Sequence, residues 1–111
     1  HSCGSVADIL PDIIEIGLDV LESVQPEAAG MNPYELKRKY GANITFFGCL
    51  GSQSTIPFGT PESIKAEVRR LRREVGRDGG YILAPAKSLQ PETPTENAAA
   101  VFEAFVEENP R

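Results

Sequence analysis

The chain has 111 residues, of which 41% are hydrophobic, and a formal net charge of −5 at pH 7. This length allows one domain at most, and the hydrophobic fraction argues against intrinsic disorder. The acidic balance argues against a nucleic-acid-binding protein, and without a run of about 20 apolar residues no membrane span is expected. Two cysteines, Cys3 and Cys49, in an acidic chain favour a cytoplasmic protein with free thiols.

The first predicted helix spans residues 6–16. Ser5 can cap its N-terminus, and Gly17 is suited to end it. Pro11 lies inside the segment, so we expect it to kink the helix or to delay its start. Apolar residues recur at three- and four-residue steps and define one buried face, formed by Val6, Ile9, Leu10, Ile13 and Ile16.

Three short apolar segments, 18–21, 44–47 and 80–84, predict β-strands. The second is rich in the β-branched and aromatic residues that favour strands. Small or polar residues follow each segment, and we expect these to form loops at residues 22–25, 48–53 and 85–88.

Two helices are predicted around the second strand. Asn32 can cap a short helix that continues to Tyr40, with Pro33 at its first position and Glu35 at its third. The longest predicted helix spans residues 61–76, and its apolar face consists of Ile64, Val68, Leu71 and Val75. Its basic run, Lys65–Arg73, is interleaved with glutamates, which favours a solvated helix face over a nucleic-acid site.

A last helix is predicted over residues 94–108. The sequence Thr93-Pro94-Thr95-Glu96 predicts a capping box at its start. We expect its inward positions to be Ala98, Val101, Phe102, Phe105 and Val106.

The element order is one helix followed by three strand–helix units. Nearly all-apolar strands alternating with one-sided helices predict an α/β fold with a parallel sheet. Three strands are few for an independent parallel sheet, but they suit a segment of an eight-stranded α/β barrel. We therefore expect residues 1–111 to form a single partial domain, the C-terminal segment of such a barrel, with about three strands and four helices.

Residues at the strand-to-helix junctions are the candidate site, because α/β barrels carry their chemistry there. His1 and Cys3 offer an imidazole and a thiol two positions apart, which suits a soft metal ion. Lys87 can pair with a substrate carboxylate, and Gln53 and Glu22 are further candidates for substrate binding. Since the chain starts within this motif, we expect it to be the C-terminal part of a longer protein.

Several of these motifs resemble the C-terminal part of the uroporphyrinogen decarboxylase superfamily. The resemblance covers essentially the whole chain in order and is carried by His1-Ser2-Cys3-Gly4, Gly17–Leu21, Phe47–Leu50, Gly79–Pro85, Gln90-Pro91 and Pro94–Asn97. It implies a (β/α)8 barrel of roughly three times this length, of which the chain would supply the last three strands.

The resemblance leaves two chemistries open. True decarboxylases of the superfamily remove carboxylates from tetrapyrroles without a metal or cofactor, using residues of the N-terminal half. The other branch transfers methyl groups from a corrinoid to a thiol, and its H-x-C motif and a later cysteine bind zinc. His1 and Cys3 match the first two zinc ligands, but Lys87 stands where that branch has cysteine and the decarboxylases have histidine.

A catalytic zinc needs three protein ligands, and for the third we predict Cys49, with Glu22 as the less suitable alternative. The sequence thus predicts a decarboxylase-family segment, inactive alone, whose parent acts on a tetrapyrrole or another acidic small molecule. The alternatives are a segment of a zinc-dependent corrinoid:thiol methyltransferase and a small self-associating α/β module without catalysis. In each case we expect homo-oligomers, because a partial barrel leaves sheet faces and edges uncovered.

Overall fold

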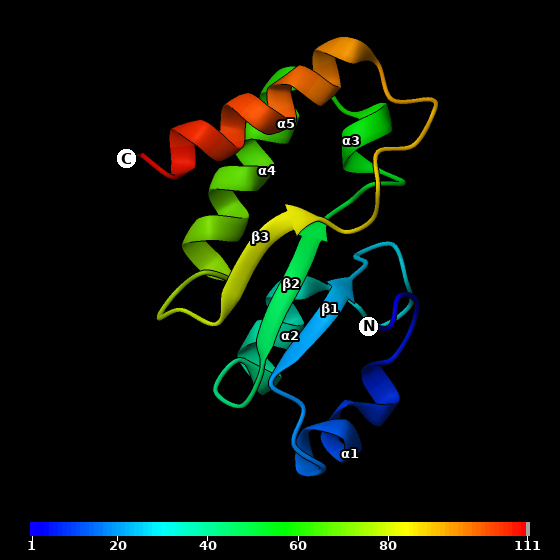
Figure 1. Ribbon diagram of the computed structural model, residues 1–111, viewed down its shortest axis with the longest axis vertical. Coiled ribbons are helices and arrows are strands. Elements are labelled where there is room, and N and C mark those ends of the chain that lie inside the picture. The colour runs from blue at the N-terminus through cyan, green and yellow to red at the C-terminus, as the bar shows by residue number, and fades with distance from the viewer. Residues whose placement is uncertain (111) are drawn as a thin grey trace.

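The computed structural model describes residues 1–110 and contains one parallel β-sheet with helices packed behind it (Figure 1). The strands are β1 (Val20–Val24), β2 (Thr45–Leu50) and β3 (Tyr81–Pro85), and they lie in the order β1-β2-β3. Each strand therefore pairs in parallel with its successor in the sequence. This succession is the one found in α/β barrels, and it confirms the predicted fold class.

The helices follow the strand–helix alternation. After a 3-10 turn, η1 (Ala7–Ile9), come α1 (Leu10–Glu15), α2 (Pro33–Tyr40), α3 (Thr55–Phe58), α4 (Pro61–Glu74) and α5 (Thr95–Glu108). Helix α2 connects β1 to β2, and α3 and α4 connect β2 to β3. In Figure 1, α2 lies behind the sheet, while α5 lies along α4.

Helix α2 begins at its predicted cap, and α4 is also capped at its start. The Asn32 side chain accepts hydrogen bonds from the backbone N–H groups of Tyr34 and Glu35, at 3.0 and 3.2 Å. Thr60 and Ser63 form a reciprocal capping box at the start of α4. These caps satisfy N–H groups that have no partner inside a helix.

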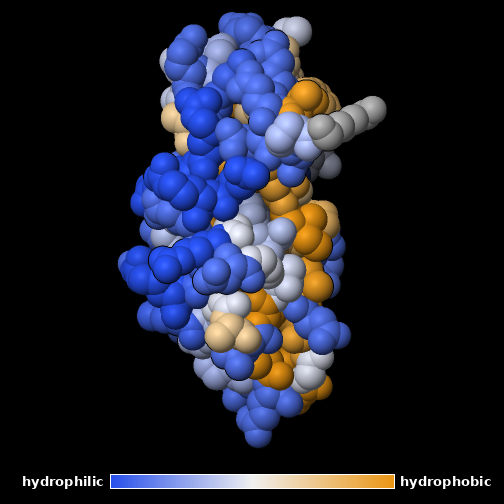
Figure 2. Space-filling view, turned by 90° about the vertical axis from the view of Figure 1, so that its left-hand side faces the viewer, coloured by the Kyte–Doolittle hydropathy of each residue, from blue (hydrophilic) through white to orange (hydrophobic). Residues whose placement is uncertain are grey.

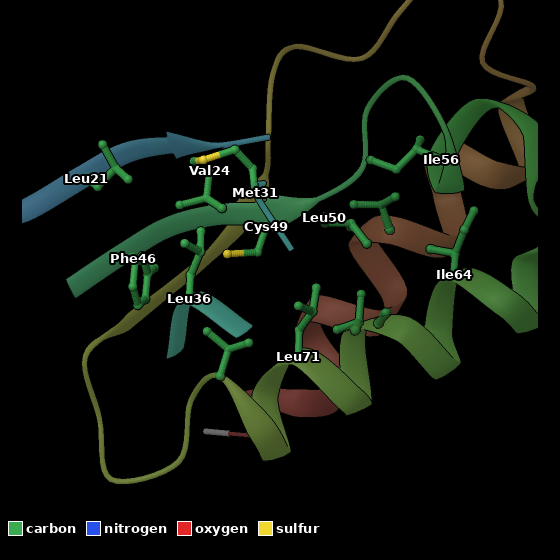
Figure 3. Close-up of a cluster of buried hydrophobic side chains, with 14 of the residues drawn as sticks. Leu21, Val24, Met31, Leu36, Phe46, Cys49, Leu50, Ile56, Ile64 and Leu71 are labelled. Carbon is green, nitrogen blue, oxygen red and sulfur yellow. The ribbon is translucent and has the colours of Figure 1, made fainter. Parts of the chain in front are cut away.

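The main core lies between the sheet and its covering helices (Figure 3). The strands contribute Leu21, Phe46 and Leu50. The apolar face predicted for residues 61–76 is fully buried, with three of its residues in α4 and Val75 at the C-cap. The other face of the sheet carries Glu22, Phe47 and Ile82 in register across the three strands. Ile82 is 43% exposed there, so this second face has no helical cover within residues 1–110.

The first predicted helix is interrupted. The 3-10 turn precedes α1, and Pro11 occupies the start of the α-helix, where a missing N–H is harmless. A 3-10 helix has three residues per turn and an α-helix has 3.6, so the apolar residues spaced for a continuous α-helix no longer all face the same side. Ile9 and Ile16, predicted to be buried, are 52% and 83% exposed, and Ser5 donates to the Ala29 carbonyl instead of capping.

Helix α5 turns only part of the predicted face inward. Val101 is buried and Phe105 packs against the core, as predicted. Phe102 and Val106 are 66% and 73% exposed, whereas Ala100 and Ala104 are buried in their place. Small alanines allow α5 to approach α4 closely, which leaves the bulky stripe outside. The predicted capping box is also absent, because Pro94 occupies the N-cap position without a side-chain cap bond.

The strands continue into segments predicted as loops. Glu22 and Ser23 lie within β1, and Gly48 and Cys49 lie within β2. The β1–β2 register shifts between Glu22 and Val24, so Ser23 is the extra residue of a β-bulge. The φ angles of Gly48 and Cys49 are 109° and 70°. Near the end of β2, side chains therefore no longer point alternately to the two faces of the sheet.

Candidate functional site

An open pocket of about 520 Å³ lies at the carboxyl end of the sheet. It is lined by His1, Glu22 and the segment that follows β3, Pro85–Leu89, which includes Lys87. Three of the predicted site residues are therefore neighbours in space although they are up to 86 positions apart in a 111-residue chain. The reason is that the carboxyl ends of parallel strands share one edge of the sheet.

An imidazole–carboxylate pair lies on one side of this pocket. His1 Nδ1 lies 3.1 Å from Glu22 Oε2, and both side chains are about half exposed. The backbone N–H of Ser2 donates to the Glu22 carbonyl at 2.6 Å, which holds the N-terminal segment along the edge of β1. This pair can donate or accept a proton at the pocket surface.

Backbone and hydroxyl groups of the neighbouring strands fix the segment that carries Lys87. The Ala86 N–H donates to the Leu50 carbonyl at 2.7 Å, and the Ser23 hydroxyl donates to the Ala86 carbonyl. The Ser52 hydroxyl contacts both backbone polar groups of Lys87. Gly48 permits this packing, because a Cβ there would meet Val24 and Ala86 backbone atoms at 3.3–3.4 Å.

Gln53 lies outside the residues that line this pocket. Its side chain accepts a hydrogen bond from Gln25 Nε2, and Gln25 Oε1 accepts from the Gly4 N–H at 3.1 Å. The Gln53 N–H in turn donates to Glu27 Oε1 at 3.1 Å. Gln53 therefore links the loops at the strand ends to one another, and its contact with a substrate stays a prediction.

The structure does not bring Cys49 to His1 and Cys3. Its side chain is 1% exposed and belongs to the core between the sheet and the helices, as Figure 3 shows. Burial raises the pKa of the Cys49 thiol far above its usual value, which disfavours the thiolate that a metal would need. Cys3, by contrast, is exposed at the strand-end rim.

The predicted zinc ligands consequently do not assemble. Within residues 1–110, no three His, Cys, Asp or Glu side chains are grouped closely enough to hold a metal ion. Zinc would require three such ligands. We therefore assign no step at this pocket to zinc.

Sequence reasoning placed Ser23, Ser52 and Gln25 in the candidate strand-end segments but assigned none of them a role. Ser23 and Ser52 are 3% and 1% exposed, yet a serine in a small, polar segment gives no signal of burial. The bulge that turns Ser23 toward Ala86 depends on the pairing of β1 with β2, which is a long-range property. The one available signal was position, since all three residues lie at or just after strand ends.

Parallel strands in sequential order, covered by crossover helices and with a pocket at their carboxyl edge, define a protein of the α/β-barrel class. The family model for uroporphyrinogen decarboxylase (URO-D) matches residues 1–108, and the chain belongs to this family. No curated protein and no solved structure matches significantly. No helix formed by residues 1–110 is long and apolar enough to cross a membrane.

Proposed function

We propose that the pocket binds a carboxylate group of an acidic small molecule and contributes to its decarboxylation, as part of a uroporphyrinogen decarboxylase family enzyme. The observation that carries this proposal is the position of Lys87. Its exposed side chain is the one lysine or arginine side chain among the residues that line the pocket, and within residues 1–110 it forms no ion pair. An unpaired ammonium beside apolar Leu89 and Pro85 suits a carboxylate on an organic skeleton.

The His1–Glu22 pair supports the second half of the proposal. When a carboxylate leaves as CO₂, the C–C bond breaks and its electron pair stays on the carbon, which then needs a proton. With His1 Nδ1–H bonded to Glu22, His1 Nε2 is the nitrogen that can deliver that proton. Glu22 would hold the ring in place and stabilise its protonated form.

Binding of a fluorescent porphyrin with acetate side chains tests this proposal in the chain as it exists. We expect Lys87→Met to weaken binding about tenfold, the equivalent of about 1.4 kcal/mol. Lys39→Met is the matched control, because Lys39 is exposed on α2 and does not line the pocket. Equal affinities of the Lys87→Met variant and the parent chain would contradict the proposal.

The zinc-dependent methyltransferase remains a separate prediction with its own test. Glu22 lies beside His1 and was the alternative third ligand, so His1, Cys3 and Glu22 are the residues to examine. Metal analysis by plasma mass spectrometry distinguishes the branches. About one zinc per chain that is lost in Cys3→Ala and retained in Cys49→Ala would favour the methyltransferase and count against decarboxylation.

Self-association is a second candidate function, and exposed hydrophobic residues favour it. Val20 and Ile82 are 38% and 43% exposed on the sheet face opposite the helices. Figure 2 shows hydrophobic residues gathered along one side of the molecule. We propose that a second copy of the chain covers this face. Light scattering should then show a dimer or larger species that Ile82→Asp dissociates, and a monomer at high concentration would refute it.

A further inference from the structure

Three polar side chains in the described chain are buried, and each one forms hydrogen bonds with backbone groups. Ser23, Ser52 and Asn97 are 3%, 1% and 2% exposed. Ser23 and Ser52 hold the segment that carries Lys87, while Asn97 holds α3. Since burying a hydroxyl is unfavourable unless it is hydrogen-bonded, these bonds decide where the two serines can lie.

We infer that Ser52, assisted by Ser23, is a positioning residue that fixes Lys87 in the pocket before any ligand arrives. The inference rests on the proposed function, because it assigns Lys87 to a carboxylate. It names the groups that make the Lys87 site rigid, and neither serine contacts the ligand in this proposal.

The Ser52 hydroxyl bonds both backbone polar groups of Lys87, which belong to two successive peptide units. Ser52 Oγ accepts from the Lys87 N–H at 2.9 Å and donates to the Lys87 carbonyl at 2.8 Å. A serine hydroxyl has one donor and two acceptor sites, so it can make both bonds together. Lys87 is thereby tied to the loop after β2, although its own side chain remains exposed.

The preceding residue is held from two other strands. The Ala86 carbonyl accepts a hydrogen bond from the Ser23 hydroxyl, and the Ala86 N–H donates to the Leu50 carbonyl at the end of β2. Ala86 is itself 3% exposed, so the backbone just before Lys87 is buried as well as bonded. A ligand that binds Lys87 therefore meets an ordered backbone, which lowers the entropy lost on binding.

Hydrogen exchange at the Lys87 amide tests the positioning without any ligand. We expect Ser52→Ala to accelerate exchange of this amide about tenfold, because its acceptor is lost. Ser54→Ala is the matched control: Ser54 lies in the same loop but its hydroxyl donates to Glu27. Unchanged exchange in a folded Ser52→Ala variant would overturn the inference. If Ser52→Ala does not fold, Ser23→Ala gives the same readout at the same amide through the Ala86 carbonyl alone.

A double-mutant cycle with the porphyrin probe then separates positioning from general stability. Ser52→Ala should weaken binding about fivefold in the parent chain and have no effect in the Lys87→Met background. An equal loss in both backgrounds would show that Ser52 acts only through the fold. Failure of the parent chain to bind the porphyrin would refute the proposed function, while the exchange measurement would still decide the role of Ser52.

Discussion

Replacing Asn97 with alanine should destabilise the protein far more than replacing an exposed asparagine of the same helix. Asn97 is 2% exposed, and its Nδ2 donates to the carbonyls of Ile56 and Gly59, both at 2.9 Å. Asn97→Ala leaves both carbonyls without this donor, one fully buried and one partly buried. At about 1–1.5 kcal/mol for each bond, we expect a loss of about 2–3 kcal/mol.

Urea denaturation followed by circular dichroism measures this loss. For a domain of this size, the same change should lower Tm by roughly 10 °C. The matched control is Asn109→Ala, which removes one exposed bond from Asn109 Nδ2 to the Phe105 carbonyl and should cost less than about 0.5 kcal/mol. If the two variants lose equal stability, the assignment of Asn97 as a buried tie between α5 and α3 is refuted.

Two further predictions concern the core. Leu71→Ala should lower the free energy of unfolding by about 2–4 kcal/mol, because Leu71 is fully buried. Val106→Ala should lower it by less than about 0.5 kcal/mol, because Val106 is 73% exposed. Equal losses in urea denaturation would contradict the exposed position of Val106 on α5. Burial raises the pKa of Cys49 and of Tyr81, so the folded chain keeps both groups neutral at pH values where the unfolded chain ionises them. Stability should therefore fall as pH rises above about 9, and a urea midpoint that is unchanged or higher at pH 10 than at pH 7.5 would refute this.

The features that the sequence predicted well are those set by local signals. Helix α4 has a proline at its first position and apolar residues at helical spacing that continue to its C-cap, Val75, and all four of these apolar residues are buried. The neighbourhood of His1, Glu22 and Lys87 followed from one general rule, because residues at the carboxyl ends of parallel strands lie at the same edge.

The features that it missed depend on tertiary packing. Helix α5 has two possible inward stripes, and the stripe with alanines is buried because it allows close contact with α4, as Phe102 and Ala104 illustrate. The position of Cys49 depends on the left-handed backbone of Gly48 and Cys49, which overrides strict alternation along β2. The spacing of residues in the sequence does not indicate this change in backbone conformation, so the sequence predicted Cys49 at the rim.

The parallel sheet has a consequence for how the chain folds. Val20 pairs with Thr45 and Phe46 pairs with Tyr81, so the paired residues lie 25 and 35 positions apart. Parallel neighbours cannot be joined by a tight hairpin turn, and each pairing must close a long loop before its hydrogen bonds contribute. The sheet therefore assembles slowly compared with its helices. Because the pocket takes its residues from the N-terminal segment, β1 and the segment after β3, it is complete only when β1, β2 and β3 have paired.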